Sequence, residues 1–302
     1  MTESATSTAP QGHRSGFIAI VGRPNVGKST LLNRLVGQKI AIVTPKPQTT
    51  RTRIVGIRTL PHAQAVFIDT PGLHQPRTLI NRRMVEVAER ALDEADVILW
   101  VVDARAGITP ADRVLAARLP TAKRALCIAL NKIDGMDRKA LLPILATLDA
   151  LLPGTDVVPV SALHGTNCLG LIEHIVSVLP EGPRFYEPDT VTDQTERVLV
   201  QEVVREKVLL QTREEIPYAV MVTIDQFEDK GTLAVISATI HVERDSQKGI
   251  IIGAGGARIK EIGRTARLEL EEVLGRRIYL ELFVRVQEDW TSREALLKEF
   301  GL

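Results

Sequence analysis

The chain has 302 residues, enough for about two domains of ordinary size, and 44% of them are hydrophobic while 25% are charged. This balance is typical of soluble globular proteins and excludes a disordered or membrane-embedded chain. Basic residues outnumber acidic ones by 21 to 14 over residues 1–180, but acidic residues outnumber basic ones by 23 to 17 over residues 181–302. Any basic surface in the second half must therefore be local.

The N-terminal residues and the cysteines favour a cytoplasmic protein. Residues 1–15 are rich in Ser, Thr and Ala and lack the apolar region of a signal peptide, so we expect a disordered tail there. No apolar run approaches the ~18 residues of a spanning helix. Cys127 and Cys168 have no metal-ligand spacing, which predicts buried, reduced thiols.

Residues 16–180 alternate short apolar runs with amphipathic stretches, a pattern that predicts an α/β domain with a mainly parallel, doubly wound sheet. The expected strands are 16–22, 63–72, 96–104, 125–134 and 156–162, and the expected helices are 28–37, 80–93, 110–119, 139–152 and 168–179.

The pattern changes after a proline-containing acidic stretch at residues 181–193, which we interpret as a linker. Residues 194–302 form the second expected domain. It begins with a helix at 194–211, continues through strands at 218–227 and 232–242, and ends with a helix to about residue 274, a strand at 277–286 and a short helix. This order predicts a smaller α+β domain with an antiparallel sheet.

The stretch "GRPNVGKST" (22–30) follows an apolar run and opens a helix, which is the context that a phosphate-binding loop requires. Its backbone N–H groups and the helix N-terminus offer donors for phosphate. Lys28 can reach the β- and γ-phosphate oxygens, and the Ser29 hydroxyl can bind Mg²⁺.

The base that this loop serves is indicated further along the chain. "NKID" (131–134) ends an apolar run, and "SAL" (161–163) follows the last expected strand. The Asp134 carboxylate can accept two N–H donors, which guanine presents and adenine does not. Together with the phosphate loop, these motifs predict a guanine nucleotide.

These motifs, with "DTPG" (69–72), resemble those of the translation-factor-related GTPases. The resemblance implies that Asp69 holds Mg²⁺ through water, that the Gly72 N–H contacts the γ-phosphate, and that Thr50 is the Mg²⁺-sensing switch threonine, with Thr49 as the nearby alternative. It implies catalytic roles for Lys28, Thr50 and Gly72, and a metal set of Ser29, Thr50 and Asp69. The implied nucleotide-binding residues are Asn25, Val26, Gly27, Lys28, Ser29, Thr30, Asp69, Gly72, Asn131, Lys132, Asp134, Ser161, Ala162 and Leu163.

Leu73 stands where many signalling GTPases carry a water-orienting glutamine. An aliphatic side chain cannot orient water, so we expect a slow intrinsic rate, roughly 10⁻⁴–10⁻² s⁻¹. Asn25 occupies the position that coordinates potassium in some relatives, and K⁺ is therefore a hypothetical second cation. Arg23, Arg51 and Arg53 are expected to be solvated charges rather than arginine fingers.

A second glycine-rich stretch, "IIGAGGARIK" (251–260), lacks both the Walker lysine and dinucleotide-binding spacing. It shows G-x-x-G at Gly253–Gly256 before an amphipathic helix, which is the RNA-clamping turn of KH domains. Ala254 and Gly255 bring no charge, so nearby basic residues must supply it. The expected RNA-binding residues are Lys248, Ile252, Gly253, Ala254, Gly255, Gly256, Arg258, Ile259 and Lys260. Phe227 and Tyr279 are expected in the core rather than as stacking platforms.

The two halves together resemble the Era family, ribosome-associated GTPases with a type II KH domain, over roughly residues 16–300. The resemblance implies a GTPase domain at 16–180, a KH-type RNA-binding domain at 194–302, and GTP or GDP with Mg²⁺ as ligands. It implies binding to single-stranded small-subunit ribosomal RNA near its 3′ end, a role in 30S subunit assembly, a monomer with no DNA partner, and peripheral contact with the inner face of the cell membrane. The alternative is an RNA-binding chaperone in which the nucleotide is a structural ligand with little turnover.

Overall fold

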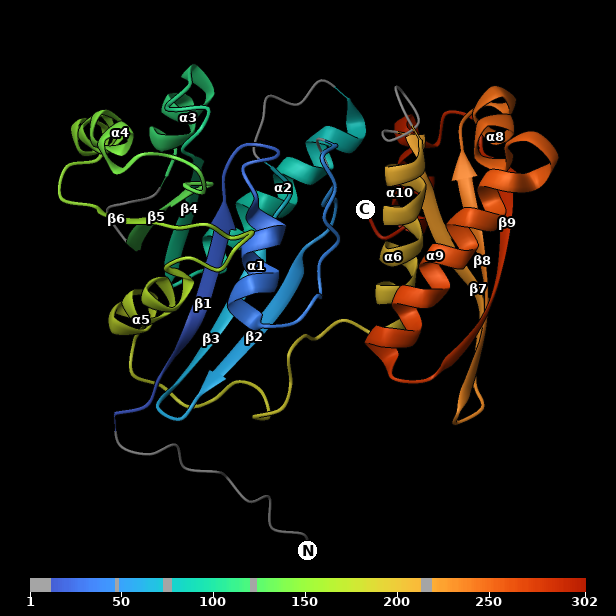
Figure 1. The fold of residues 1–302 in the computed structure, drawn as a ribbon, viewed down its shortest axis with the longest axis horizontal. Coiled ribbons are helices and arrows are strands. Elements are labelled where there is room, and N and C mark those ends of the chain that lie inside the picture. Colours follow the sequence, from blue (N-terminus) through green and yellow to red (C-terminus); the bar gives the residue numbers. More distant parts are fainter. Residues whose placement is uncertain (1–11, 47–48, 73–77, 120–123, 213–218) are drawn as a thin grey trace, which may run out of the picture. The chain divides into compact units, whose positions relative to one another are not determined.

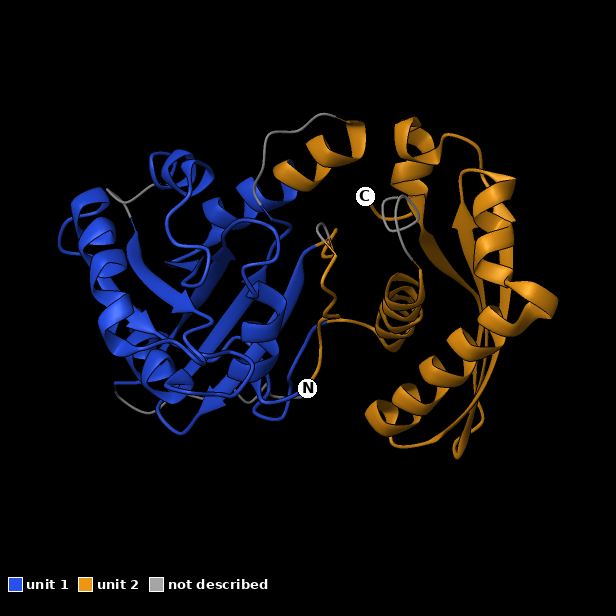
Figure 2. Cartoon of the chain, turned by 45° about the horizontal axis from the view of Figure 1, so that its top comes forward, with its two compact units in different colours: residues 1–38, 53–74, 86–193 blue, residues 39–52, 75–85, 194–302 orange. Residues whose placement is uncertain are grey.

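The computed structural model describes residues 12–46, 49–72, 78–119, 124–212 and 219–302. These divide into two compact units (Figure 2). Unit 1 comprises residues 1–38, 53–74 and 86–193, and unit 2 comprises residues 39–52, 75–85 and 194–302. Two short segments of the predicted GTPase domain, 39–52 and 75–85, therefore group with the C-terminal part of the chain.

Unit 1 is built on a six-stranded sheet of order β2-β3-β1-β4-β5-β6 (Figure 1). Only the β2–β3 pair is antiparallel. The sheet therefore has the mainly parallel, doubly wound character predicted from the sequence. The strands are β1 (Arg14–Val21), β2 (Ile54–Leu60), β3 (Ala63–Asp69), β4 (Val97–Asp103), β5 (Ala125–Asn131) and β6 (Asp156–Pro159).

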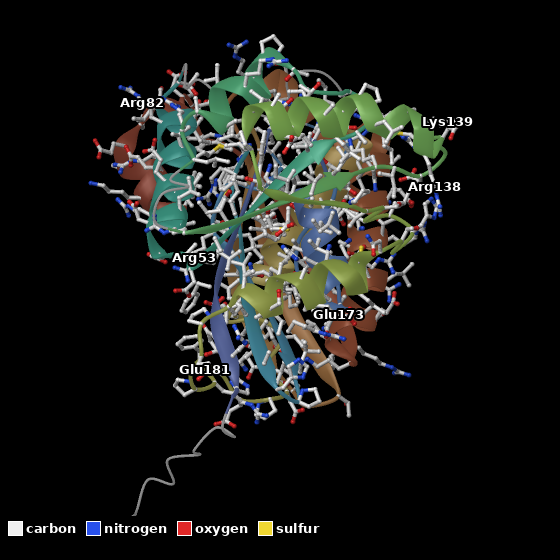
Figure 3. The ribbon with its side chains drawn as sticks, turned by 90° about the vertical axis from the view of Figure 1, so that its left-hand side faces the viewer. Arg53, Arg82, Arg138, Lys139, Glu173 and Glu181 are labelled. Atoms are coloured by element: carbon white, nitrogen blue, oxygen red, sulfur yellow. The ribbon has the colours of Figure 1, made fainter. Side chains whose placement is uncertain are left out.

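Helices cover both faces of this sheet because its central strands are apolar throughout. α1 (Lys28–Val36) and α5 (Cys168–Val178) lie on one face. α3 (Pro110–Ala116), α4 (Arg138–Leu151) and the second half of α2 (Leu79–Glu94) share a buried cluster with β1, β4 and β5 on the other. Figure 3 shows Arg138 and Lys139 at the exposed start of α4. Cys127 and Cys168 are buried and free, as predicted.

The sequence analysis did not anticipate β2, an edge strand, nor the start of β1 at Arg14. Ser15 donates its N–H to the Pro180 carbonyl, and its hydroxyl bonds the Pro183 carbonyl at 2.6 Å. The stretch interpreted as a linker is likewise held along unit 1, where Ile57 N–H bonds the Val191 carbonyl. Residues 1–11 of the expected tail, Leu73 and Tyr218 lie outside the described residues.

Unit 2 contains a three-stranded sheet of order β7-β8-β9, with β7 (Met221–Asp229) antiparallel and β9 (Arg277–Val286) parallel to β8 (Leu233–Val242). The sheet is therefore mixed, and the expectation of an antiparallel sheet is wrong for the β8–β9 pair. α6 (Glu196–Gln211) and α9 (Ala257–Leu274) pack on one face over a cluster of aliphatic residues. α8 (Asp245–Ile252) and a 3₁₀ turn at Ala254–Gly256 precede α9, and α10 (Glu294–Glu299) follows a second such turn at Trp290–Ser292. Among the described residues, no helix is long and apolar enough to cross a membrane.

Candidate functional site

The first glycine loop leaves the end of β1 and enters α1. Gly27 adopts φ +99°, and a Cβ there would lie 2.4 Å from the Asn131 amide nitrogen. That nitrogen donates to the Val26 carbonyl at 2.9 Å. Glycine is required at this position because the loop backbone touches the side chain that ends β5. The phosphate loop and the "NKID" loop are thus in direct contact.

Lys28, the first residue of α1, follows this loop and has only 6% of its surface exposed. Its ammonium group donates to the Gly22 carbonyl at 3.1 Å and the Arg23 carbonyl at 3.0 Å. Burial lowers the pKa of Lys28 to about 8; the Asp69 carboxylate opposes the shift and Arg23 adds to it. A phosphate oxygen would supply the desolvated ammonium with the counter-charge that two carbonyl groups do not provide.

Oxygen atoms suited to Mg²⁺ meet beside the loop. Ser29 donates its hydroxyl to Asp69 Oδ2 at 2.6 Å, and Asp69 is fully buried at the end of β3. Hydroxyl and carboxylate oxygens are the ligands that Mg²⁺ prefers, so this pair fits the ion. Bound there with the nucleotide, Mg²⁺ would neutralise charge on the phosphates.

Gly72 follows Asp69 and lies against the same loop. A Cβ on Gly72 would come within 2.7 Å of the Pro24 nitrogen. Only glycine lets the backbone at the end of "DTPG" approach the phosphate loop this closely. The structure therefore brings Gly72 together with the loop that carries Lys28 and Ser29.

The side chains expected to bind guanine form a hydrogen-bonded group at the ends of β5 and β6. Asn131 Oδ1 accepts the Ala162 N–H at 3.0 Å, and Asp134 Oδ1 accepts the Ser161 hydroxyl at 2.8 Å. The hydrogen bond from Ser161 lowers the pKa of Asp134, against the effect of burial and with further help from Arg105. Asp134 is thus held as the acceptor-only carboxylate that guanine recognition needs. The Leu163 side chain is exposed, and its carbonyl accepts a hydrogen bond from Arg34 at 2.7 Å.

Asp103, the last residue of β4, and Arg105, in the loop after it, belong to this group, although the sequence analysis did not find them. Lys132 donates to Asp103 Oδ2 at 2.7 Å and to the Asn25 carbonyl at 2.6 Å. Arg105 pairs with Asp134 Oδ2 and donates to its carbonyl at 2.8 Å. The sequence signal that could have identified Asp103 is its place at the carboxyl end of β4, the strand next to β5 in the sheet.

The expectation that the loop and switch arginines are solvated is wrong for two of the three. Arg23 pairs with the fully buried Asp112 at 2.7 Å, and Arg51 is 5% exposed. Arg53, shown in Figure 3, pairs with Glu94 at 2.8 Å and stays partly exposed. The buried carboxylate of α3 explains Arg23, because a buried charge needs a partner.

Thr50 lies in segment 39–52 of unit 2, where it is 7% exposed, whereas Ser29 and Asp69 lie in unit 1. The Thr49 hydroxyl donates to the Lys46 carbonyl at 2.8 Å and lies 2.7 Å from the Thr44 hydroxyl. The Thr49 hydroxyl is therefore engaged within its own segment.

The second glycine loop joins α8 to α9 in unit 2. Gly253 has φ +72°, and a Cβ there would lie 2.9 Å from the Arg258 Cβ, so glycine is required for both conformation and space. A Cβ on Gly255 or Gly256 would meet nothing within 4 Å. The backbone at these two positions is therefore open to a ligand.

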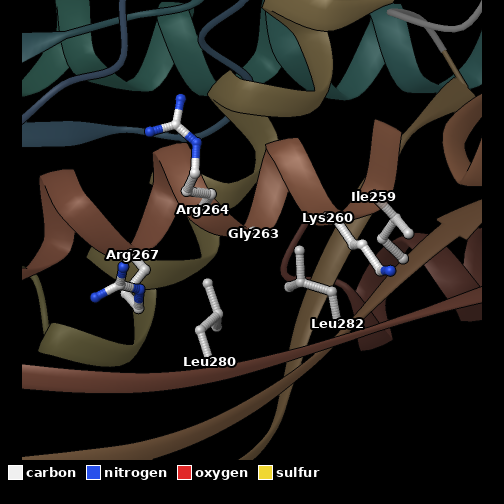
Figure 4. A pocket seen from close by; sticks show the side chains of 7 residues that line it. All are labelled: Ile259, Lys260, Gly263, Arg264, Arg267, Leu280 and Leu282. Atoms are coloured by element: carbon white, nitrogen blue, oxygen red, sulfur yellow. The ribbon is translucent and has the colours of Figure 1, made fainter. Parts of the chain in front are cut away.

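A cavity of about 400 Å³ adjoins this loop between α9 and β9 (Figure 4). It is apolar at Ile259, Leu280 and Leu282 and basic at its α9 side. Gly263 widens it, because a Cβ there would approach Leu282 at 3.5 Å. The full lining is Ile259, Lys260, Gly263, Arg264, Arg267, Leu280 and Leu282.

Comparison with known proteins identifies the family to which this chain is related. A family described as "50S ribosome-binding GTPase" matches residues 17–132, and the KH domain family matches residues 215–291. The chain is 48% identical to GTPase Era of Geotalea daltonii over 96% of this chain and 98% of that protein. It is also 48% identical to GTPase Era of Geobacter metallireducens over 95% and 97% of the two chains. The chain belongs to the Era family of GTPases.

Two Era crystal structures share the fold. Era in complex with MgGDPNP and nucleotides 1506–1542 of 16S ribosomal RNA matches with a TM-score of 0.93 and 42% identity, over 96% of this chain and 99% of that one. A variant of Aquifex aeolicus Era bound to GDP and AlF₄⁻ also matches with a TM-score of 0.93 and 42% identity, over 95% and 99%.

Membership in the Era family confirms the predicted fold class, a P-loop GTPase domain followed by a KH domain. It also makes the chain an enzyme that hydrolyses GTP, which decides against the alternative of a nucleotide-binding chaperone with little turnover.

Three arginines around the KH loop of this Era chain already bond other groups of the same chain. Arg258 donates to the Ile250 carbonyl and so holds the loop's two sides together. Arg264 pairs with Glu261 at 2.7 Å, and Arg267 pairs with Glu271 at 3.1 Å. Lys260 is exposed at the cavity, and Lys248 is half-buried on α8.

The expectation that Tyr279 belongs to the core is wrong. Tyr279 is 52% exposed and Phe283 is 53% exposed, both on β9, whereas Phe227 packs partly against the aliphatic cluster as expected. Tyr279 alternates with Ile278 and Leu280, which face the aliphatic cluster, and it therefore lies on the opposite face of the sheet.

Proposed function

We propose that this Era GTPase couples GTP binding and hydrolysis to the binding of single-stranded small-subunit ribosomal RNA near its 3′ end, and acts in 30S subunit assembly. The observation that carries the proposal is the open backbone at Gly255 and Gly256 beside the cavity between α9 and β9. Glycines let a sugar–phosphate backbone approach, and an apolar groove accepts bases. The relative with 16S nucleotides 1506–1542 supports the choice of RNA.

In this proposal the nucleotide is held by the residues named from the sequence. Asn25 to Thr30 surround the phosphates, Asn131, Lys132 and Asp134 bind guanine, and Ser161 to Leu163 offer main-chain contacts. Ser29, Asp69 and Thr50 serve Mg²⁺, and Gly72 contacts the γ-phosphate. Thr49 remains the nearby alternative to Thr50 as the switch threonine.

The RNA is held by the loop and its flanks. Gly253 to Gly256 contribute backbone, Ile252 and Ile259 apolar contact, and Lys248 and Lys260 charge. Arg258 acts chiefly through the loop, since its guanidinium bonds the Ile250 carbonyl.

RNA crosslinking and sequencing with the wild type and with Gly253→Asp/Gly256→Asp tests the proposal in both nucleotide states. The expected result is a crosslink near the 3′ end of the small-subunit RNA that the double substitution removes, because carboxylates repel phosphates. Lys139→Asp on α4 is the matched control, with a charge change on an exposed site of unit 1. Unchanged crosslinks in the Gly253→Asp/Gly256→Asp protein would refute the proposed RNA site.

Coupling between the two ligands has a quantitative consequence. If GTP tightens RNA binding, RNA must tighten GTP binding by the same factor. Equal RNA affinities in the presence of GDP and of a non-hydrolysable GTP analogue would exclude the coupling.

Four finer expectations belong to the same proposal. Potassium at Asn25 predicts faster GTP turnover in K⁺ than in Na⁺ buffer. Monomeric mass in light scattering tests the expected monomer. A cytoplasmic location with peripheral contact at the inner membrane face predicts partial co-sedimentation with anionic vesicles. Contact with the 30S subunit predicts co-sedimentation with it that the Gly253→Asp/Gly256→Asp protein loses.

A further inference from the structure

The segment that carries Thr50 is fixed by a buried arginine from α6. Segment 39–52 and α6 belong to the same compact unit. Arg205 is 1% exposed and pairs with Glu202 through two hydrogen bonds of 2.8 and 2.5 Å. Its Nη2 also donates to the Thr49 carbonyl at 2.6 Å. A charge-assisted hydrogen bond in a buried site is strong and directional, so the peptide between Thr49 and Thr50 is held in place.

The residue on the other side of Thr50 is anchored as well. Arg51 donates to the Val220 carbonyl at 2.7 Å, and its guanidinium lies 5.6 Å from the centre of the Trp290 ring. Trp290 is fully buried and donates its indole N–H to the Ala219 carbonyl at 3.0 Å. Thr50 therefore stands between a main-chain carbonyl, that of Thr49, and a side chain, that of Arg51, which other residues of unit 2 hold.

The beginning of the segment is tied to the same helix. The Val43 N–H donates to Glu206 Oε1 at 2.8 Å, and Lys39 pairs with Glu206 Oε2 at 2.7 Å. Glu206 is 2% exposed. Arg205 and Glu206, adjacent on α6, thus hold the segment at two separate places.

We infer that Arg205 is a positioning residue for GTP hydrolysis, which holds the main chain beside Thr50. The inference rests on the proposed role of Thr50 as a Mg²⁺ ligand. Switch segments of GTPases are ordinarily ordered by contacts to the γ-phosphate and its Mg²⁺, and this ordering has an entropic cost. Here hydrogen bonds from α6 order the backbone beside Thr50 without the nucleotide. The entropic cost of ordering this segment when GTP binds is therefore smaller.

A positioning role has a signature that a general structural role lacks. GDP has no γ-phosphate, so its binding depends little on the switch threonine, whereas hydrolysis and its Mg²⁺ requirement depend on it directly. Loss of Arg205 therefore slows hydrolysis and raises the Mg²⁺ concentration that hydrolysis needs, while GDP affinity stays constant.

The experiment uses the full-length protein with Glu202→Gln/Arg205→Gln, because Arg205→Gln alone would leave the Glu202 charge unpaired in a buried site. Arg205→Lys is the conservative variant, and Arg197→Gln, an exposed arginine on α6, is the matched control. Single-turnover GTP hydrolysis is measured against Mg²⁺ concentration, together with GDP affinity and thermal unfolding.

We expect the double variant to hydrolyse GTP about ten- to a hundredfold more slowly, the effect of a misplaced catalytic group, with GDP affinity unchanged. Arg205→Lys recovers part of the rate, and Arg197→Gln matches the wild type. An unchanged hydrolysis rate in the folded double variant would overturn the inference, as would an equal loss of GDP affinity.

Thr50→Ala separates this inference from the proposal on which it rests. If Thr50→Ala leaves hydrolysis unchanged, the metal role of Thr50 and the inference both fall. If Thr50→Ala slows hydrolysis and the double variant does not, only the inference falls. RNA affinity without nucleotide, measured on the same proteins, tests the RNA-binding proposal separately.

Discussion

The two glycine loops of this chain have similar sequence character but opposite physical settings. In the loop at 22–27, Gly27 is crowded against Asn131, and the following Lys28 is buried with its ammonium on loop carbonyls. In the loop at 253–256, Gly255 and Gly256 have open space around them, and Ala254 is exposed. The first loop encloses a charge, and the second offers only backbone.

The difference shows that glycine spacing reports how the backbone can bend, while neighbouring side chains determine which ligand is bound. A buried lysine beside a Ser29–Asp69 oxygen pair suits a compact, highly charged group with a metal ion. Open backbone beside an apolar cavity suits a chain of phosphates with bases attached. Substitutions in the two loops and their flanks should therefore affect different ligands.

The largest expected effect is on the first loop. Lys28→Ala should weaken GDP and GTP binding about a hundredfold, because it removes the buried cation that we propose to make charge-assisted hydrogen bonds to phosphate. Titration with a fluorescent GDP analogue measures the affinity, and Lys139→Ala on α4 is the control. RNA affinity without nucleotide should stay unchanged. A loss of RNA binding would contradict the separation of the two loops.

The sequence could predict the first site because its motifs are contiguous. Lys28 and Ser29 belong to the phosphate-loop motif, and Asp69 and Asn131, whose roles the family resemblance implies, end apolar strands. Partners that depend on chain folding could not be found this way. Arg105 reaches Asp134 across 29 residues, and Arg205 reaches Thr49 across 156.

The mistaken placement of Tyr279 has a related cause. Alternation along a strand identifies two faces but does not say whether both are covered. β9 buries Ile278 against the aliphatic cluster and leaves Tyr279 exposed. Strand β2 was missed because Gly56 and Arg58 interrupt its apolar character, and pairing with β3 stabilises it instead.

A comparison of two glycines tests the setting of the second loop. Gly253→Ala places a Cβ 2.9 Å from the Arg258 Cβ at φ +72°, whereas Gly255→Ala meets only the strain of φ +56°. We expect Gly253→Ala to lower the free energy of unfolding by about 2–3 kcal/mol and Gly255→Ala by about 1 kcal/mol. Fluorescence of Trp290 in a Trp100→Phe background reports on unit 2 alone. If both substitutions lowered the free energy of unfolding equally, the loop would be able to move away from a Cβ at position 253 at little cost.

Salt dependence tests which charges serve the second loop. Each lysine that contacts an RNA phosphate should contribute about 0.7 to the slope of log affinity against log salt. Lys248→Ala and Lys260→Ala should each reduce the slope by that amount. Arg264→Ala should change it less, because Arg264 already pairs with Glu261. A larger change in the slope for Arg264→Ala than for Lys260→Ala would show that Arg264, rather than Lys260, contacts an RNA phosphate.

The smallest expected effect concerns the helix that follows the second loop. Glu269 on α9 accepts hydrogen bonds from Lys39 and Lys207. Burial opposes its ionisation, but the hydrogen bonds from Lys207 and Lys39 outweigh it, so the pKa of Glu269 falls below the ordinary value of 4.5. A carboxyl group with a lowered folded-state pKa stabilises the protein above its unfolded pKa and loses that effect as the pH falls through the folded pKa.

Glu269→Gln should therefore lower the free energy of unfolding by less than about 1 kcal/mol at neutral pH, since the group is partly exposed to solvent. The difference in the free energy of unfolding between the wild type and Glu269→Gln should be largest above pH 4.5 and should shrink below it. Urea unfolding followed by Trp290 fluorescence measures it. RNA affinity should stay the same, because the loop's own backbone is untouched. A gap that does not depend on pH would mean that Glu269 acts through packing rather than charge, and lost RNA affinity would mean that the second loop depends on how α9 is anchored.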